Sequence, residues 1–358
     1  MLNRRSLQRL GDAGVAVRHN VALSELTTLR LGGPAPTVLH CATTDALVRA
    51  VRACDDAGEP VLVLGGGSNL VVADDGVCAT VVQVASSGVE VDAGGVHVEA
   101  GADWDAVVAA TVAAGAGGLE CLSGIPGRTG ATPVQNVGAY GVEVGDLLTE
   151  VQLLERASGA VRWVLPEELR LGYRTSALKH TDSAVVLALR LRLHADGLSR
   201  PVTYRELFNT LGVTDGTRLP ATAVRAAVLA LRRGKGMVLD PGDHDSWSAG
   251  SFFTNPVVDD GALAAVLARA GDDLPRYPTE GGTKLSAGWL IERAGFRRGH
   301  PGPDAAARLS TKHTLALTNR GAASTEQLLA LAREVRDGVD RAFGVRMSPE
   351  PVLVCCRL

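Results

Sequence analysis

The sequence predicts a mixed α+β fold organised as two unequal domains. Segments with strand-like alternation and segments with helical periodicity follow one another along 358 residues, a length that commonly forms two or three domains. Two glycine-rich stretches are present, and both lie in the first part. Residues 195–201, Ala-Asp-Gly-Leu-Ser-Arg-Pro, are typical of a linker. We therefore expect a lead-in at 1–27, a larger domain at 28–195 and a smaller α+β domain at 196–358.

Composition and charge argue against several classes of protein. Hydrophobic residues make up 46% and charged residues 21% of the chain, as in ordinary soluble domains. The formal net charge of −3 gives no basic field for nucleic acid. The opening Met-Leu-Asn-Arg-Arg is not followed by an apolar run, and no window approaches the length of an uncharged membrane span. We expect a cytoplasmic monomer without nucleic-acid or membrane partners.

Six cysteines occur, and none has the C-x-x-C spacing of a metal site. Most stand among apolar residues, which indicates reduced core thiols and no metal centre.

Periodicity predicts the elements of the first part. Apolar residues between Thr44 and Gly58 fall on one helical face. Residues 89–98 alternate on both sides of Ala-Gly-Gly, which is typical of a hairpin. The other expected elements are strands near 21, 60–64, 81–84 and 185–193, a helix at 103–115, and a hairpin of 151–155 with 161–164.

The second part has fewer clear signals. A helix is expected from Thr222 to Arg233, and residues 240–248 are expected to form a polar loop. Ser324 and Gln327 form a capping-box pattern for a helix that runs to Phe343 and ends at glycine. The remaining expectations are a final strand at 351–356 and a core position for the Phe252–Phe253 pair.

The most informative stretch is 123–141, which has five glycines and two prolines in nineteen residues. Such a run is a poor helix, and its prolines would interrupt a central strand. Because glycine has no Cβ, the run can bring backbone N–H groups close to a ligand. Hydroxyl and amide side chains can add directional contacts, namely those of Ser123, Thr129, Thr132, Gln135 and Asn136. The alternative is a long surface loop without a ligand.

A second glycine stretch favours the ligand interpretation. Residues 60–64 form a short apolar strand that leads into Gly65-Gly-Gly-Ser-Asn69. Consecutive backbone N–H groups in such a turn can bind a pyrophosphate.

Six segments together resemble the UDP-N-acetylenolpyruvoylglucosamine reductase family, also called UDP-N-acetylmuramate dehydrogenases. They occur in the family's order from about residue 20 to the end of the chain. The segments are Gly65–Asn69, Ser123–Gly141, Gly172-Tyr-Arg-Thr-Ser176, Ala249-Gly-Ser-Phe-Phe-Thr-Asn-Pro256, Lys284-Leu-Ser-Ala-Gly-Trp-Leu-Ile291 and Pro349-Glu-Pro351. Thr175 and a longer polar loop before Ser251 depart from the family pattern. Pro201–Tyr204 resembles the tyrosine-bearing insertion of the longer subclass.

The resemblance implies an FAD-binding domain of the vanillyl-alcohol-oxidase (PCMH) type at 28–195 and a substrate-binding domain at 196–358. The last strand of the second domain would return to the active site. The cofactor-binding residues it implies are Gly65, Gly66, Gly67, Ser68, Asn69, Ser123, Gly124, Gly127, Gly130, Ala131 and Tyr140. Neither glycine stretch contains histidine, so we expect FAD to be bound non-covalently.

The implied reaction, in peptidoglycan precursor synthesis, has two halves. NADPH reduces the flavin, and UDP-N-acetylglucosamine enolpyruvate then receives hydride at C3 and a proton at C2, giving UDP-N-acetylmuramate. The developing charge next to the substrate carboxylate requires fixed hydrogen-bonding and positive partners, and the proton requires a positioned acid.

The resemblance gives three residues catalytic roles. Ser251 would donate the proton, although its residue type also suits a turn cap. Arg174 would pair with the substrate carboxylate, because a guanidinium binds a carboxylate with two hydrogen bonds; a surface arginine is the alternative. Glu350 would complete the site near C2, whereas the sequence alone favours an exposed glutamate between prolines.

Substrate binding is assigned to five residues, with two lysines and an amide suited to a diphosphate. They are Tyr173, Tyr204, Lys235, Asn255 and Lys284. A solvated surface charge is the alternative for each lysine.

Two rival functions remain open. One is an FAD-dependent sugar or hydroxy-acid oxidase of the same superfamily, which would usually lack the Gly-Ser-Phe-Phe-x-Asn-Pro segment. The other is a non-enzymatic nucleotide-binding protein, which would be expected to have lost Ser251, Arg174 or Glu350.

Overall fold

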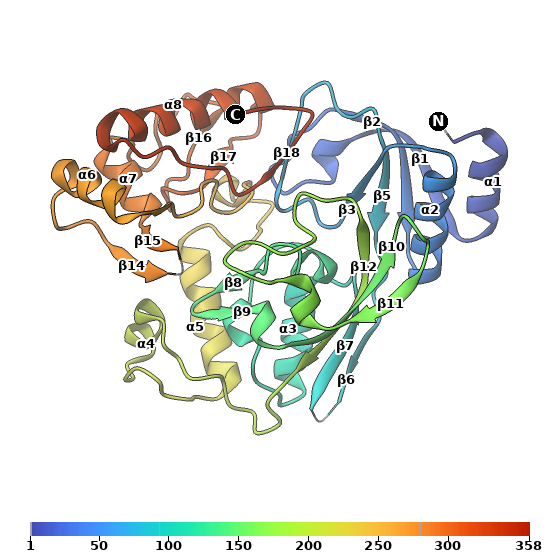
Figure 1. Ribbon diagram of the computed structural model, residues 1–358, viewed down its shortest axis with the longest axis horizontal. Helices are drawn as coiled ribbons and strands as arrows, with labels where there is room; N and C mark the ends of the chain where they lie inside the picture. The colour runs from blue at the N-terminus through green and yellow to red at the C-terminus, as the bar shows by residue number, and fades with distance from the viewer. Residues whose placement is uncertain (1, 93, 280) are drawn as a thin grey trace. The chain divides into compact units, whose positions relative to one another are not determined.

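The computed structural model describes residues 2–92, 94–279 and 281–358, which form two compact units. Unit 1 comprises Met1–Val21, Ala35–Gly66 and Cys78–Arg233. Unit 2 comprises Ala22–Pro34, Gly67–Val77 and Gly234–Leu358. Helices and strands are mixed in both units, which confirms the predicted α+β class (Figure 1).

Unit 1 contains two sheets. The first has four strands in the order β1 (Val15–Ala22), β2 (Pro34–Cys41), β5 (Thr80–Val84) and β3 (Val61–Leu64). Strands β2 and β3 are both parallel to β5. The second sheet is antiparallel, in the order β11 (Val161–Val164), β10 (Leu148–Glu155), β12 (Ala184–Arg192), β7 (Gly95–Glu99) and β6 (Val89–Val91). A short ribbon joins β8 (Gly138–Ala139) to β9 (Val142–Glu143).

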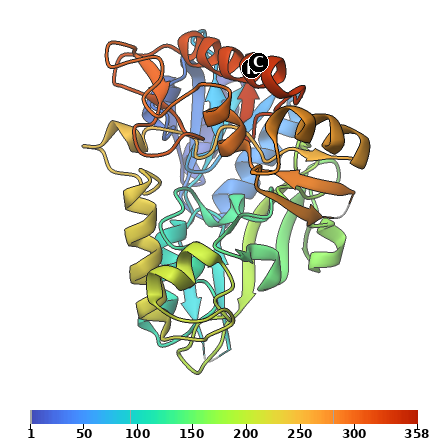
Figure 2. The ribbon, with the colours of Figure 1, turned by 90° about the vertical axis from the view of Figure 1, so that its left-hand side faces the viewer.

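Five helices belong to unit 1: α1 (Arg4–Asp12), α2 (Thr44–Asp56), α3 (Trp104–Ala113), α4 (Arg205–Leu211) and α5 (Ala221–Gly234). Side-chain caps begin two of them, because Thr43 accepts the Ala46 N–H and Asp103 accepts the Ala106 N–H. Helices α4 and α5 are yellow-green and yellow in Figure 2. Val224 and Val228 of α5 are fully buried in the core of unit 1.

Unit 2 is assembled from short strands and three helices: α6 (Asp260–Ala270), α7 (Ala287–Arg293) and α8 (Thr325–Phe343). Its strands are β13 (Val257–Val258), β15 (Gly282–Leu285) and β14 (Arg276–Thr279) in one sheet, the pair β16 (Ala307–Leu309) and β17 (Leu317–Asn319), and the parallel pair β18 (Val352–Val354) and β4 (Leu70–Val72). Helix α8, red in Figure 1, packs against β16 and β17 with its apolar stripe buried.

Most elements predicted from periodicity are confirmed. The capping box at Ser324 and Gln327 is present, and Gly344 ends α8 in the left-handed conformation. Both hairpins form, although Ala93, at the turn of the first, lies outside the described residues. Phe252 and Phe253 are core residues, each 1% exposed. The sequence prediction missed α1, α4, α6, α7 and most strands of unit 2.

The compact units differ in extent from the predicted domains. Residues up to Arg233 belong to unit 1, because α5 buries its apolar face in that core. Segments 22–34 and 67–77 belong to unit 2, where β4 pairs with β18 near the end of the chain.

Three cysteines, Cys41, Cys54 and Cys121, are buried as free thiols, whereas Cys78 and Cys355 are exposed and Cys356 is half-buried. In the described part of the chain, no helix is both long and apolar enough to span a membrane.

Candidate functional site

The Ser123–Gly141 loop of unit 1 is anchored by a carboxylate near its start. The Asp105 carboxylate accepts the Gly124 N–H at 2.6 Å. The same carboxylate accepts two hydrogen bonds from the guanidinium of Arg225, at 2.6 and 2.9 Å. Burial alone would raise the pKa of Asp105, but these hydrogen bonds and the positive charges of Arg225 and Arg232 lower it. Helices α3 and α5 therefore hold the loop through one ionised side chain.

The middle of the loop is pinned against residues 100–104. The N–H groups of Thr129 and Gly130 donate to the carbonyls of Ala102 and Ala100, at 2.9 and 2.7 Å. The carbonyl of Gly127 accepts the Trp104 N–H at 3.1 Å. These bonds fix the backbone of the glycine-rich run.

Several residues predicted to bind the cofactor also have structural contacts. Ser123 is fully buried, and its hydroxyl donates to the Glu120 carbonyl at 2.6 Å. The Ala131 N–H donates to the Arg128 carbonyl at 3.0 Å, while the side chain of Ala131 is exposed. Their contacts with a cofactor stay predictions.

Two of the three glycines in Gly65–Asn69 are required by close packing. A Cβ on Gly66 would lie 2.8 Å from the Gly127 Cα, within unit 1. Gly67 has a φ of +60°, and a Cβ there would lie 2.1 Å from the Leu26 carbonyl oxygen, within unit 2. Larger residues at these positions would displace the backbone.

Asn69 brings this motif to the predicted catalytic glutamate within unit 2. Its side-chain amide donates to the Glu350 carbonyl at 3.4 Å, and its own carbonyl accepts the Val352 N–H at 2.9 Å. The motif therefore joins the segment that carries Glu350. Ser68, between the glycines and Asn69, is half-buried.

Arg174 lies on a tight turn that faces the glycine loop in unit 1. Gly172 and Thr175 exchange backbone hydrogen bonds around it, and Arg174 has a φ of +53°, a conformation that costs a side-chain-bearing residue about 1–2 kcal/mol. Its guanidinium donates to the Gly138 carbonyl at 2.8 Å. A Cβ on Gly138 would lie 3.1 Å from the Arg174 Nη1, so glycine leaves room for the guanidinium.

Asn136 connects the glycine loop to that turn. Its buried side chain donates to the Glu143 carboxylate at 2.7 Å and to the Gly172 carbonyl at 3.2 Å. Its amide oxygen accepts the Gly145 N–H at 3.0 Å. The side chain of Asn136 therefore organises the loop and the Arg174 turn as one assembly.

Two of the predicted tyrosines meet in unit 1. The rings of Tyr140 and Tyr204 are 5.4 Å apart and form an edge-on contact at 84°. Burial raises the pKa of Tyr140 to about 12, with the nearby Arg232 opposing the shift. Tyr173 is 39% exposed, and the Arg174 guanidinium lies 5.3 Å above its ring.

Ser251 and Glu350 lie on adjoining backbone segments of unit 2. The Glu350 N–H donates to the Phe252 carbonyl at 2.8 Å, and the Thr254 N–H donates to the Ser348 carbonyl at 3.1 Å. Ser251 and Glu350 are both half-buried. The structure thus brings together two of the three predicted catalytic residues, which are about 100 positions apart in the chain.

The predicted substrate residues of unit 2 are partly grouped. Lys284 lies on β15 opposite Val257, and the Asn255 side chain accepts the Ala287 N–H at the start of α7, at 3.0 Å. Lys235 directly follows α5 and is half-buried.

Comparison with known proteins places the chain in a family. Residues 240–354 match the model of the UDP-N-acetylenolpyruvoylglucosamine reductase C-terminal domain, and residues 35–165 match an FAD-binding domain model. A UDP-N-acetylenolpyruvoylglucosamine reductase of Nocardia farcinica is 64% identical, covering 98% of this chain and 92% of that protein. The chain belongs to the UDP-N-acetylenolpyruvoylglucosamine reductase family.

Further relatives agree with this assignment. A UDP-N-acetylenolpyruvoylglucosamine reductase of Saccharopolyspora erythraea is 61% identical, covering 94% of this chain and 95% of that protein. The crystal structure of UDP-N-acetylenolpyruvylglucosamine reductase from Thermus caldophilus has a TM-score of 0.65 and 28% identity, covering 95% of this chain and 98% of that one. These matches confirm the predicted FAD domain of the PCMH type and the reductase family.

The glycine packing described above fits the FAD of this reductase family. A pyrophosphate needs backbone N–H groups that no side chain covers, and the internal packing of Gly66 and Gly67 keeps both positions free of side chains. Gly124 and Gly130 were also expected to bind FAD, but the N–H groups of both already donate to partners within unit 1. At these two glycines, contact with FAD would use other atoms.

Sequence reasoning missed the residues that support this reductase site. Asp105 and Arg225 are 120 positions apart, and Asn136 was noted only as a possible ligand contact. An acidic residue in the first turn of a helix is common, so Asp105 gave no signal of a distant partner.

Proposed function

We propose that the protein catalyses the NADPH-dependent reduction of UDP-N-acetylglucosamine enolpyruvate to UDP-N-acetylmuramate, as a cytoplasmic monomer with non-covalent FAD. The observation that supports this proposal most directly is the backbone hydrogen bonding between the Ser251 segment and the Glu350 segment. Family membership and the FAD-binding domain set the reaction class. Neither glycine stretch contains a histidine that could form a covalent bond to the flavin, which supports a non-covalent cofactor.

The residues suited to hold FAD are the glycines and polar residues of Gly65–Asn69 and the Ser123–Gly141 loop with Tyr140. The chemistry that bound FAD supplies is hydride transfer, from NADPH to C3 of the enolpyruvyl group. The absence of side chains at Gly66 and Gly67, which their packing against protein backbone enforces, supports backbone N–H contacts to the pyrophosphate.

Ser251 is proposed to deliver the proton to C2. A serine hydroxyl is a weak acid, so its position must be fixed where the carbanion develops. The neighbouring Phe252 supplies both backbone groups for this purpose: its N–H donates to the Leu315 carbonyl at 2.8 Å, and its carbonyl accepts the Glu350 N–H at 2.8 Å. Glu350 is proposed to complete the proton-donating site from the adjoining segment.

Arg174 is proposed to pair with the substrate carboxylate and to stabilise the enolate charge next to it. Its guanidinium is oriented by the Gly138 carbonyl, at 2.8 Å, while the Glu143 carboxylate lies 4.0 Å from Nη1. A guanidinium fixed before the substrate binds loses little freedom when the charge develops. Tyr173, Tyr204, Lys235, Asn255 and Lys284 are proposed to bind the sugar nucleotide.

Anaerobic stopped-flow spectroscopy tests the proposed reaction. The protein is reduced with NADPH, and the reduced protein is mixed with UDP-N-acetylglucosamine enolpyruvate while the flavin absorbance is followed. Rapid reoxidation without oxygen is expected. Prompt reduction by NADPH without reoxidation by this substrate would favour the oxidase alternative, which oxygen and a panel of sugars would then test.

A further inference from the structure

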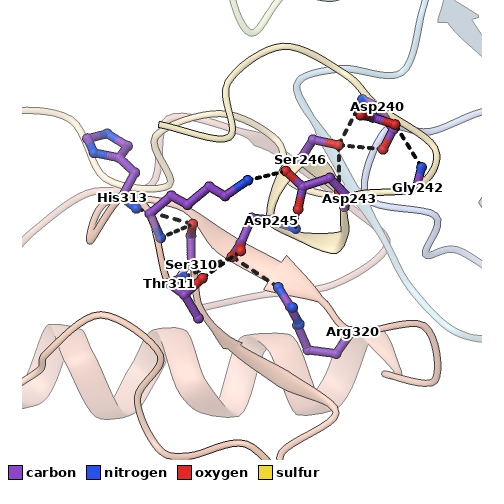
Figure 3. A network of polar contacts seen from close by, with 10 residues as sticks. Asp240, Gly242, Asp243, Asp245, Ser246, Ser310, Thr311, His313 and Arg320 are labelled. Atoms are coloured by element: carbon purple, nitrogen blue, oxygen red, sulfur yellow. Dashed lines mark hydrogen bonds and ion pairs between the residues drawn. The ribbon is translucent and has the colours of Figure 1, made fainter. Parts of the chain in front are cut away.

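A buried carboxylate in unit 2, Asp245, contacts the turn that joins β16 to β17 and the residue that directly follows β17 (Figure 3). Asp245 belongs to the short 3-10 turn His244–Ser246 and is only 4% exposed. It accepts the Thr311 N–H at 2.8 Å and the Thr311 hydroxyl at 2.6 Å. The Arg320 guanidinium donates to it at 3.0 Å. Three donor atoms from two residues therefore converge on this buried carboxylate, which links the turn His244–Ser246 to Thr311 and Arg320.

The ionised form of Asp245 is the one that these partners favour. Burial alone would raise its pKa, but the hydrogen bonds from Thr311 and Ser310 and the charge of Arg320 outweigh burial and lower the pKa. A charged acceptor makes stronger hydrogen bonds than a neutral one.

The turn that Asp245 contacts is connected to the Ser251 segment through a short series of hydrogen bonds. Thr311 is the second residue of the turn 310–316. The start of this turn is ordered because the Ser310 hydroxyl accepts the N–H groups of Lys312 and His313 at 3.0 and 3.2 Å. The Ser310 N–H donates to the Ala316 carbonyl at 2.8 Å and closes the turn.

The end of the turn then fixes the backbone beside Ser251. The Leu315 carbonyl accepts the Phe252 N–H at 2.8 Å, and the Phe252 carbonyl accepts the Glu350 N–H at 2.8 Å. On the other side, the Trp247 carbonyl accepts the Asn319 N–H from β17 at 3.1 Å. The Ser251 segment is therefore attached to the β16–β17 hairpin on both sides.

We propose that Asp245 is a positioning residue for the proton donor. It fixes the turn 310–316 from the same polar loop that leads into Ser251, so the hydroxyl of Ser251 is held at one place. The inference rests on the proposed function of Ser251. The predicted polar loop at 240–248 is accordingly a support for the turn, through its contacts with residues 311, 312 and 320.

The neighbouring ion pair offers a matched control. The Asp243 carboxylate pairs with Lys312 at 2.6 Å, and the two side chains are 28% and 39% exposed. Asp243 also accepts the Asp245 N–H through its Oδ1 at 3.0 Å, a bond that an asparagine oxygen preserves. Asp243→Asn thus makes the same chemical change on the same loop, at a pair that is more exposed than Asp245 and is therefore expected to contribute less.

The experiment compares Asp245→Asn, Asp243→Asn and Ser251→Ala holoenzymes by anaerobic stopped-flow in both half-reactions. Displacing a reacting group by about 1 Å costs on the order of 100-fold in rate. Asp245→Asn is expected to slow reoxidation by UDP-N-acetylglucosamine enolpyruvate about 10- to 100-fold, with the rate of flavin reduction by NADPH and the Kd of the substrate nearly unchanged. Asp243→Asn is expected to match wild type in all three quantities.

Comparison of the variants distinguishes a failure of this inference from a failure of the proposed function. If Ser251→Ala reoxidises at the wild-type rate, the proposed role of Ser251 fails. If Ser251→Ala is slow while Asp245→Asn is as fast as wild type, the positioning role fails alone. An equal slowing of both half-reactions in Asp245→Asn, with loss of flavin, also overturns it, because that pattern indicates general damage.

Thr311→Val provides a second test if Asp245→Asn does not fold. It keeps the side-chain shape and the backbone bond but removes the hydroxyl that donates to Asp245 at 2.6 Å. A selective slowing of reoxidation, smaller than that expected for Asp245→Asn, supports the proposal. Wild-type rates in Thr311→Val contradict it.

Discussion

Asp105→Asn tests the anchoring of the glycine loop. The carboxylate makes three short contacts, two with Arg225 and one with the Gly124 N–H. Oδ1 accepts the Gly124 N–H and the Arg225 Nη1, so an asparagine oxygen in that position can keep both as bonds to a neutral acceptor, while its NH2 group would face the Arg225 Nη2 donor. A hydrogen bond to a charged group contributes about 1.5–3 kcal/mol. Because 34% of the Asp105 side chain is exposed, solvent screening reduces the loss, and we expect about 2–3 kcal/mol.

This loss converts into a measurable change in melting temperature. Unit 1 contains about 200 residues, and in domains of that size 1 kcal/mol corresponds to about 2–4 °C. Differential scanning calorimetry at pH 7 should therefore show the transition of unit 1 lowered by about 4–12 °C. Asp45→Asn is the control, since Asp45 forms an exposed pair with Arg49, 72% and 58% exposed, and should shift the transition by about 2 °C or less.

The stabilisation by Asp105 should depend on pH, and its lowered pKa gives the direction of that dependence. The folded state lowers the pKa of Asp105, so its stabilisation is complete above the ordinary aspartate pKa, about 4, and is lost as the pH falls through the folded-state value. The difference between wild type and Asp105→Asn should therefore shrink below about pH 4. A melting temperature for Asp105→Asn within about 1 °C of wild type at pH 7 would refute the reasoning.

Three further predictions concern the cofactor, the substrate carboxylate and the thiols. Gly66→Ala places a Cβ 2.8 Å from the Gly127 Cα and should cost about 1–3 kcal/mol of packing, so the flavin-to-protein absorbance ratio after gel filtration should fall; an unchanged ratio counts against the proposed role of Gly65–Asn69 in binding FAD. Arg174→Lys cannot make two parallel bonds to a carboxylate, so reoxidation by the enolpyruvyl substrate should slow about 10-fold or more while reduction by NADPH is retained; equal slowing of both contradicts the role. A thiol reagent at neutral pH should modify the exposed Cys78 and Cys355 in the native protein. Burial raises the pKa of Cys41, Cys54 and Cys121 to about 12, so these three thiols should react slowly, and their early modification in mass spectrometry would contradict the prediction.

Local patterns were enough to predict the elements with strong signals. Helix α8 has a capping box, a continuous apolar stripe and a terminal glycine, and each feature depends on residues within one or two turns. Helix α6 was missed because its Ala-rich sequence has a weak apolar face, although Asp259 caps it by accepting the Ala262 N–H.

Long-range partners could not be predicted from periodicity. Asp105 meets Arg225 across 120 positions, and Asp245 meets Thr311 across 66. The exchange of segments between the two units is also non-local, since β4 pairs with β18 about 280 residues later. The resemblance to the family supplied the candidates Ser251, Arg174 and Glu350, whereas the residues alone favoured surface positions for Arg174 and Glu350 and left a turn cap open for Ser251.

The most direct test of the central claim is the reoxidation rate of Ser251→Ala. The variant is reduced with NADPH without oxygen and then mixed with UDP-N-acetylglucosamine enolpyruvate. Loss of a positioned proton donor costs on the order of 100- to 10,000-fold, so reduction should proceed at the wild-type rate while reoxidation slows by at least 100-fold. Reoxidation at the wild-type rate would show that the proton comes from another group, and the account of the site would be wrong.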